Sequence, residues 1–270
     1  MSDEPVSVVP MAPFPLFPSW PGLPRPTTRS PCVAEGVDAR LKAGDDDAES
    51  DGMPDAPLLP DPSFRRLLGE PQWRSLVPAV RARFAWKPAA GAGLRYVGAM
   101  EVVRSSRAGW LLAQLFRLIG TPLAPHRGTQ VPVTVTLRLA EDGKGVVWHR
   151  LYRFPGRAPV ACVSVKEASE RHGLVERVGA GIGMWLRLSA REGALHFEST
   201  GYFWRLGRFH LRLPDWLTPG VLHVAHIDEG GGRFRFRIAV EHPRFGEVFF
   251  QDGVFCLYPE ETPWTASSSS

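Results

Sequence analysis

One arginine stands among aromatic residues in the segment VVWHRLYRF, residues 146–154. The segment alternates as a β-strand does, and side chains on a strand repeat every two residues, so Trp148, Arg150 and Tyr152 share one face. A guanidinium buried among rings without a partner is energetically costly. We therefore expect Arg150 to meet either an internal carboxylate, for which Glu176 in LVERVG is the candidate, or the anionic group of a ligand.

Two histidines are candidates for proton transfer. His226 and Asp228, in LHVAHID, share a strand face, whereas His223 lies three residues from His226 and points to the opposite face. These two histidines therefore cannot bind one metal ion together from this strand. His242 closes the apolar face of RFRFRIAVEH. A histidine that shares a cavity with Glu176 could act as an acid–base pair, and the alternative is a hydrogen-bonded core residue.

No segment has the spacing of a metal-binding, dinucleotide-binding or covalent-catalysis motif. Cys32, Cys162 and Cys256 are isolated, which predicts buried free thiols in a reducing compartment. The glycines of GAGIGM, residues 179–184, do not lead from a strand into a helix, so they are no dinucleotide fingerprint. We expect neither a metal nor a cofactor, and we interpret Lys166, in SVKE, as a charge at the rim of the fold.

The elements that must position these residues are mostly strands. From Leu94 onward, short segments of period two are separated by polar turns such as AEDGKG, PGRAP and EGGG. They predict a mostly β (α+β) domain whose antiparallel sheet of about ten strands curls into a barrel or deep half-barrel. Gly179, Gly181 and Gly183 suit a bend or bulge in such a sheet. Helices do not alternate with strands, which excludes a parallel α/β fold. A barrel of this kind can enclose a ligand cavity.

Helices are expected in two places. A first short helix should follow the cap at Asp61 and end at Gly69. A second should start at Glu70 and Pro71, with either a kink or a fresh helix start at Pro78. An inserted helix, RAGWLLAQLFRLIG at residues 107–120, is apolar nearly all round. Such a helix is usually buried, and the alternative is a lid that touches a membrane.

Composition divides the chain into a folded part and two tails. The first sixty residues hold 12 of the 26 prolines and carry 4 basic and 10 acidic residues, a net charge of −6. The remainder has 28 basic and 18 acidic residues, a net charge of +10. We expect a disordered Pro-rich and acidic tail at residues 1–58, a single β-rich domain at 59–260 and a disordered tail at 261–270.

The basic balance does not point to nucleic acid. Of the 32 cationic residues 28 are arginine, and they are spread over the strands instead of clustered. No apolar run reaches the roughly 18 residues that a membrane span needs. The N-terminus MSDEP is acidic where a signal peptide would be basic. We expect a cytoplasmic protein with no transmembrane segment and no nucleic-acid partner.

An ordered series of motifs resembles a known family. FRRLLG, YVGAMEV, LIGTPL, WHRLYRFPG, GLVERVGAGIGMWLRL, ALHFESTGYFW, LPDWLTPG and HPRFGEVFFQDGVF together resemble the bacterial family known as domain of unknown function 4166, over about residues 62–258. Members occur alone or behind a reductase domain similar to saccharopine dehydrogenase, which this chain lacks. The resemblance therefore implies a separate reductase as a partner. It transfers no catalytic role, and its recurring motifs fall here on Trp148, Arg150, Glu176, Tyr202, His226, His242 and Gln251.

These observations favour a small-molecule-binding domain. A lipophilic ligand would contact apolar walls and present its anionic group to Arg150. The walls would be Trp148, Tyr152, Phe234, Phe236 and Phe250, and the candidate ligand-binding residues are Arg150, Trp148, Tyr152, Glu176, Tyr202, His226, His242 and Gln251. One alternative is an enzyme, or a substrate-handling accessory of a reductase, in which His226 or His242 exchanges protons with Glu176. The other is a scaffold whose Pro-rich tail recruits partners.

Overall fold

The computed structural model describes residues 58–117, 123–169, 172–207 and 209–258. The two predicted tails, at residues 1–58 and 261–270, lie outside this part of the chain apart from Leu58, and so does Cys32. The described residues begin in a small two-stranded sheet and continue into one large antiparallel sheet.

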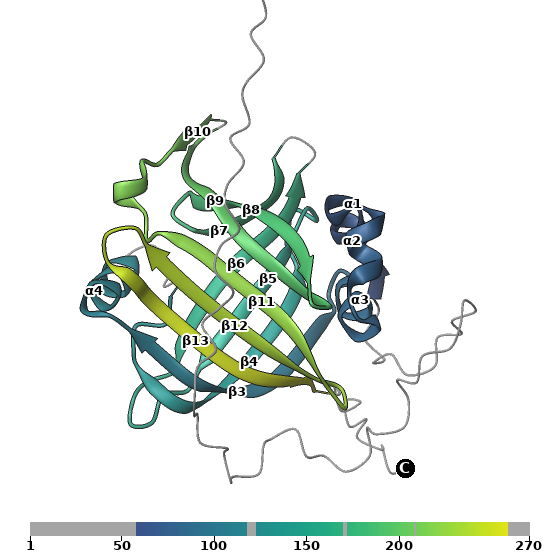
Figure 1. Cartoon of the computed structure of the whole chain (residues 1–270), viewed down its shortest axis with the longest axis horizontal. Helices are drawn as coiled ribbons and strands as arrows, with labels where there is room; N and C mark the ends of the chain where they lie inside the picture. The colour runs from purple at the N-terminus through teal and green to yellow at the C-terminus, as the bar shows by residue number, and fades with distance from the viewer. Residues whose placement is uncertain (1–57, 118–122, 170–171, 208, 259–270) are drawn as a thin grey trace, which may run out of the picture.

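Ten antiparallel strands of the large sheet close into a barrel (Figure 1). Each strand pairs with the next in the order β3-β4-β5-β6-β7-β8-β9-β11-β12-β13, and β13 pairs with β3 to complete the circle. This confirms the predicted antiparallel barrel. The bounds are β3 (Gly93–Ser105), β4 (Gly128–Leu139), β5 (Val146–Tyr152), β6 (Val160–Ser169), β7 (Gly173–Gly179), β8 (Ile182–Arg191), β9 (Ala194–Leu206), β11 (Val221–Gly230), β12 (Arg233–His242) and β13 (Gly246–Leu257).

The alternation of apolar and polar residues decides which face of each strand is interior. In β4, Val131, Val133 and Val135 are buried, while Pro132 between them is exposed and Thr134 is half-buried. The bend predicted from the glycines lies at the β7–β8 turn, where the register shifts between Arg177 and Gly179. Gly179 and Gly181 both have positive φ there, a backbone conformation that favours glycine.

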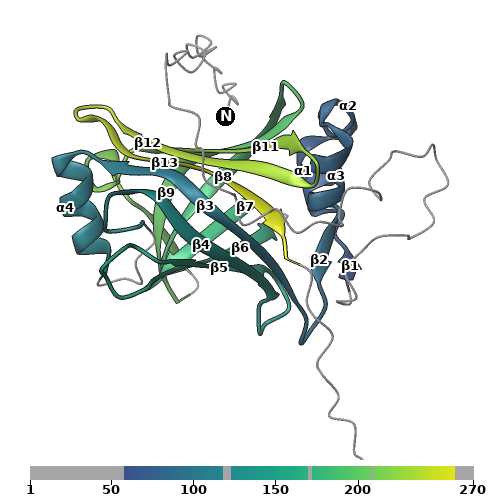
Figure 2. The ribbon, with the colours of Figure 1, turned by 90° about the horizontal axis from the view of Figure 1, so that it is seen from below.

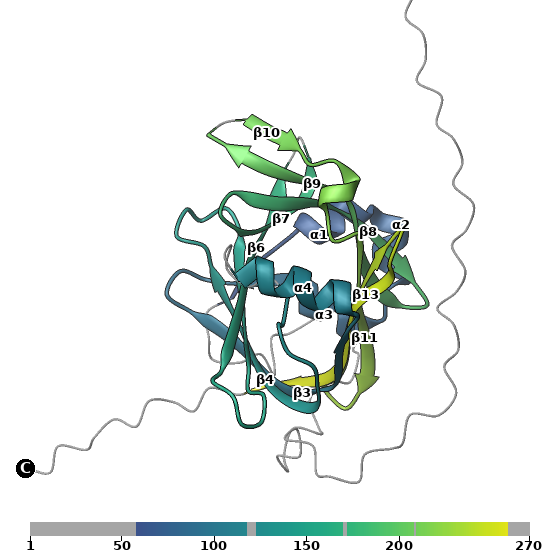
Figure 3. The same ribbon diagram turned by 90° about the vertical axis from the view of Figure 1, so that its left-hand side faces the viewer.

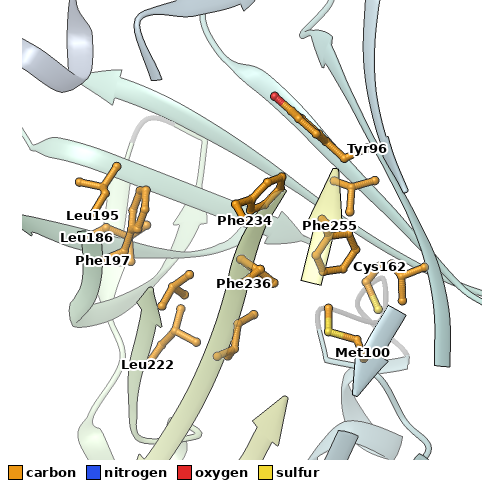
Figure 4. Packing of buried hydrophobic residues seen from close by; sticks show 14 of the residues in the cluster. Tyr96, Met100, Cys162, Leu186, Leu195, Phe197, Leu222, Phe234, Phe236 and Phe255 are labelled. Atoms are coloured by element: carbon orange, nitrogen blue, oxygen red, sulfur yellow. The ribbon is translucent and has the colours of Figure 1, made fainter. Parts of the chain in front are cut away.

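The interior is filled mainly by aromatic and branched aliphatic side chains (Figure 4). Phe234 lies at the centre of one cluster: its ring centroid is 5.3 Å from that of Tyr96 in an edge contact and 5.8 Å from that of Phe255. Phe236 continues the same inward face of β12. The predicted wall residue Phe250 is not part of this core, because Phe249 and Gln251 occupy the inward positions of β13. Phe250 stacks under the guanidinium of Arg104 instead, with Arg104 Cζ 4.2 Å from the ring centroid.

Short helices cover one end of the barrel (Figures 1 and 2). They are α1 (Ser63–Leu68), α2 (Glu70–Ser75) and α3 (Pro78–Phe84), flanked by the paired strands β1 (Leu58–Pro60) and β2 (Trp86–Pro88). The Asp61 carboxylate accepts the N–H of Ser63 at 3.0 Å. Of the two alternatives at Pro78, the structure has the fresh helix start: α2 ends at Ser75 and Pro78 begins α3. Phe84 of α3 enters the barrel and meets the His226 ring edge-on, with 5.0 Å between the centroids.

Helix α4 (Arg107–Phe116) lies across the opposite opening (Figure 3). Ser106 caps it by accepting the N–H of Gly109 at 3.1 Å. The expectation that this helix is buried is wrong for most of its surface, because only Gly109 and Ala113 are buried. The helix packs on β13 through this narrow stripe of small residues: a Cβ on Gly109 would lie 1.7 Å from the Val248 carbonyl oxygen. Three of its large apolar side chains, Trp110, Leu111 and Leu115, are exposed.

Two further elements stand at the same end as α4. Strand β10 (Phe209–Arg212) forms a hairpin with the end of β9, and η2 (Asp215–Leu217) follows it (Figures 1 and 3). Within the part of the chain that the structure describes, no helix is both long enough and apolar enough to cross a membrane.

Candidate functional site

Three neighbouring strands bring four polar side chains together inside the barrel. Arg150 on β5, Ser164 and Lys166 on β6, and Glu176 on β7 all point inward, and Lys166 and Glu176 are direct cross-strand partners. Arg150 Nη2 donates to Ser164 Oγ at 2.6 Å and lies 3.7 Å from Glu176 Oε1. Lys166 Nζ donates to the same Glu176 oxygen at 2.8 Å. We call Arg150, Ser164, Lys166 and Glu176 the charged cluster.

Glu176 is thus the predicted partner of Arg150, but it is shared with a second cation. The expectation that Lys166 is a rim charge is wrong, because its side chain is only 10% exposed. Closure of the barrel turns the inward face of β6 toward the axis, and the amine lies 4.8 Å from the Trp148 ring centroid. The charged cluster therefore holds two cations against one carboxylate.

The protonation of the cluster follows from burial and from these charges. Burial alone would raise the pKa of the Glu176 carboxyl, but the charges of Lys166 and Arg150 and the hydrogen bonds from Lys166 and Ser164 outweigh it and hold this pKa below its usual value. Burial, aided by the nearby Arg150 charge, lowers the pKa of Lys166, and Glu176 opposes this shift. Arg150 Nε is buried with no hydrogen-bond partner among the described residues. The cluster thus has a surplus of positive charge and an unused N–H donor.

An apolar cavity of about 170 Å³ lies beside the charged cluster, on the side of the barrel that α4 covers. Arg150, Lys166, Glu176 and Tyr202 contribute its polar lining. Burial raises the pKa of the Tyr202 phenol, so the hydroxyl stays protonated at neutral pH. We call this space the α4-side cavity. Its other lining residues are Phe116, Leu123, Trp148, Val178, Ile182, Met184, Leu213, Leu217, Thr218, Pro219, Leu222, Val224, Phe236, Ile238 and Val240.

A second, smaller cavity of about 90 Å³ lies under α1–α3. Trp148 and Lys166 line both cavities, so these two side chains stand between them. Arg83 of α3 lines the smaller cavity with its Cζ 3.9 Å from the Phe234 ring centroid, and its Nη1 has no hydrogen-bond partner among the described residues. Nothing in the sequence marks Arg83 as a site residue, because an arginine on an amphipathic helix carries no signal that it faces inward.

His226 lies in an aromatic surrounding within this smaller cavity. Its ring centroid is 5.0 Å from that of Phe236 and 6.0 Å from that of Trp148, and Nδ1 is buried without a hydrogen-bond partner among the described residues. Burial, together with the charges of Arg83, Lys166 and Arg150, holds the pKa of His226 well below its usual range. The imidazole is therefore neutral at pH 7. The described contacts include no hydrogen bond from His226 to Asp228 or Glu176.

The other predicted site residues have framework contacts. Tyr152 donates its hydroxyl to Gln251 Oε1 at 3.0 Å, a buried bond between residues 99 positions apart in the chain. His242 Nδ1 accepts the N–H of Arg244 at 3.1 Å, and the ring stacks on Phe245 in the β12–β13 turn. None of these three predicted residues lines the α4-side cavity. The structure thus gathers Trp148, Arg150, Glu176 and Tyr202 around one cavity and places Tyr152, Gln251, His226 and His242 elsewhere.

Metal and thiol chemistry find no support among the described residues. They contain no group of three or more His, Cys, Asp or Glu side chains that could hold a metal ion. The Cys162 thiol is buried, and burial raises its pKa to about 11, so it is protonated at neutral pH.

Comparison with protein families gives one match. Residues 76–255 match the family described as Domain of unknown function (DUF4166). The comparisons with curated proteins and with solved structures found no match. The match covers the barrel from the end of α2 to β13, and its description states no activity.

Proposed function

We propose that this chain, which belongs to the family described as Domain of unknown function (DUF4166), binds a small lipophilic anion in the α4-side cavity. The observation that carries the proposal is the charge imbalance of the cluster, in which two cations share one carboxylate beside an apolar cavity. A carboxylate is the simplest ligand group that would remove the imbalance.

The imbalance matters because these charges are withdrawn from water. A buried ion pair offsets part of its desolvation cost through mutual attraction, and a third buried charge has no such compensation. A ligand carboxylate next to Arg150 would supply the missing negative charge. It would also accept a hydrogen bond from the unused Nε–H of that side chain. The protonated Tyr202 hydroxyl offers a further donor at the cavity wall.

The size of the cavity limits the ligand. A volume of about 170 Å³ is below the roughly 300–1,000 Å³ of typical ligand pockets. An engineered apolar cavity of about 150 Å³ in another protein holds benzene. The proposed ligand class is therefore one aromatic ring or a short alkyl chain that carries a carboxylate, and 3-phenylpropionate is a suitable probe.

Titration calorimetry with 3-phenylpropionate and with its neutral amide tests the proposal. Wild type should bind the carboxylate at least about tenfold more tightly than the amide, because a hydrogen bond to a charged group contributes about 1.5–3 kcal/mol. Arg150→Met should remove this preference. Arg153→Met is the matched control, since Arg153 is an exposed neighbour whose Nη1 bonds to Thr134 on the outside.

Two results would refute the proposal. One is equal affinity for acid and amide in wild type. The other is a preference that survives Arg150→Met, provided that circular dichroism shows both arginine variants to be folded. Native mass spectrometry of freshly purified protein adds an unbiased search for a co-purified acid of this size.

The enzymatic alternative has weaker support. Proton transfer between Glu176 and His226 or His242 needs hydrogen-bond reach or one bridging water. His226 lies in the smaller cavity and His242 bonds to its own turn, while the Glu176 carboxylate is held by Lys166. A separate reductase as partner stays a hypothesis that rests on the family resemblance alone.

A further inference from the structure

The end of the barrel that α4 covers exposes an unusual number of large apolar side chains. On α4, Trp110 and Leu111 are 46% and 56% exposed, and on η2 Trp216 and Leu217 are 69% and 53% exposed. The β9–β10 hairpin and the β12–β13 turn, which lie at this same end (Figures 1 and 3), carry further exposed apolar side chains. We call the set the mouth ring: Trp110, Leu111, Leu115, Trp204, Leu206, Phe209, Leu211, Trp216, Leu217 and Phe245.

The mouth ring is a local feature of the surface. Of the described large apolar residues that are exposed, Leu59, Trp86 and Tyr258 lie elsewhere. The ring members come from four separate elements that surround the opening over the α4-side cavity (Figure 3). Leu217 belongs to the ring and also lines that cavity. Exposed apolar patches of this kind mark contact sites for membranes or for other macromolecules.

Arginines accompany the mouth ring. Exposed arginines on its elements and on the adjoining loops are Arg107, Arg117, Arg127, Arg205, Arg212 and Arg244. The described carboxylates in the same segments are Asp215, Glu241 and Glu247, and Glu247 is already bonded to Arg104 at 2.8 Å. A partner that matches this surface should therefore present negative charge to the arginines and an apolar region to the tryptophan and leucine side chains.

We propose that the mouth ring docks the barrel on an anionic membrane surface, with α4 lying in the interface and the opening of the α4-side cavity toward the lipid. Tryptophan and leucine side chains insert at the boundary between headgroups and acyl chains, where an interfacial helix buries its apolar face. Arginines beside them are attracted to anionic lipid headgroups, each by about fivefold in the partition constant. The surface has both components.

Other occupants fit the surface less well. A two-fold dimer through this face would place two faces with an excess of arginines against each other, and like charges across an interface repel. A protein partner would need to match apolar side chains that project from four elements around an opening. A membrane adapts to such a shape, because lipids are fluid.

Docking also gives a lipophilic ligand a route to the site. Phe116 of α4 and Leu217 of η2 line the α4-side cavity at its membrane-facing end. A ligand could then pass from the bilayer into the cavity without crossing bulk water. This route, unlike the docking itself, rests on the proposed function.

Co-sedimentation of the full chain with lipid vesicles tests the docking. The chain should bind vesicles that contain phosphatidylglycerol, bind pure phosphatidylcholine vesicles at least about tenfold more weakly, and lose binding as salt is added. Trp110→Ser combined with Leu111→Ser should weaken binding to phosphatidylglycerol vesicles at least about tenfold. Trp86→Ser, at the opposite end of the barrel, should leave it unchanged, and both variants should still bind 3-phenylpropionate.

The proposal is overturned if the chain ignores both vesicle types, or if the α4 variant sediments like wild type. It is also overturned if the chain self-associates with a concentration dependence that the α4 variant abolishes, because a second copy then covers the face. Loss of vesicle binding with intact 3-phenylpropionate binding concerns the docking alone. Failure to bind 3-phenylpropionate while vesicle binding persists refutes only the proposed function.

Discussion

Replacing Glu176 by glutamine changes the charge of the interior cluster without changing its shape. The substitution leaves Lys166 and Arg150 as two buried cations with no carboxylate between them. We expect two opposite consequences: the folded state loses stability, and the cavity gains affinity for an anion.

The size of the stability loss follows from the contacts. The Glu176 oxygen lies 2.8 Å from Lys166 Nζ and 3.7 Å from Arg150 Nη2. At an effective dielectric constant of about 20 these pairs attract by about 6 and about 4 kcal/mol, and desolvation offsets part of this. Breaking a buried pair from one side typically costs about 3–5 kcal/mol, and we expect a loss of that size. The double variant Glu176→Gln with Lys166→Met carries one buried cation instead of two and should recover most of it.

The loss should depend on pH. Burial already lowers the pKa of Lys166, and Glu176 opposes this, so removing Glu176 lowers the pKa further. Between this lowered pKa and the ordinary value of about 10.4 the unfolded chain binds a proton that the folded chain has lost. Stability of Glu176→Gln should therefore rise with pH across this range, and its deficit relative to wild type should shrink.

Urea unfolding from pH 6 to 10 measures how much less stable Glu176→Gln is than wild type. The increase in melting temperature on adding 3-phenylpropionate at pH 7 measures the stabilisation by the ligand. The shift should be largest in Glu176→Gln, intermediate in wild type and smallest in Arg150→Met, because the tighter complex gives the larger stabilisation at a fixed ligand concentration. A Glu176→Gln variant as stable as wild type at pH 7, or one whose shift is smaller than that of wild type, would contradict the charge argument.

Three further predictions concern other parts of the barrel. His226→Phe should weaken the loss of stability that wild type shows at acid pH. The pKa of His226 in the folded state lies well below its ordinary value of about 6.5. Wild type should therefore lose about 1.4 kcal/mol of stability through this group for each pH unit below about 6.5, down to the folded-state pKa. Parallel urea profiles of the two proteins would refute this. Gly109→Ala should displace α4 from Val248, cost about 1–3 kcal/mol and speed release of 3-phenylpropionate in stopped flow, whereas the exposed Leu115→Ala should do neither. Tyr152→Phe should cost about 1–3 kcal/mol in urea unfolding by leaving Gln251 Oε1 unpaired, and adding Gln251→Leu should recover part of that loss.

The amino-acid pattern alone determined the class of fold and one half of the site. Period-two segments with polar turns are enough to predict an antiparallel barrel, because each strand must present one apolar face to a common interior. The same period places Trp148 and Arg150 on one face, and the cost of burying a guanidinium predicts a carboxylate partner. Glu176 lies 3.7 Å from Arg150 in the structure.

Only the tertiary structure decided which faces turn inward and at what depth. Lys166 was expected at the rim and lies beside Glu176, and Phe250 was expected in the wall and lies outside against Arg104. His226 and His242 carry no mark in the sequence that separates them, yet one is enclosed by rings and the other supports a turn. Alternation groups residues by face, but closure of the sheet assigns each face to the interior or the solvent. It also sets how far along the barrel axis each residue lies.

The inserted helix shows the same limit most clearly. Its apolar composition predicted either burial or contact with a membrane, and no pattern within residues 107–116 separates the two. The choice depends on what covers the helix, and here the Val248 carbonyl of β13 lies against the small residue Gly109. Hydrophobicity is a property of the segment, whereas exposure is a property of its neighbours, which the chain brings together from distant positions.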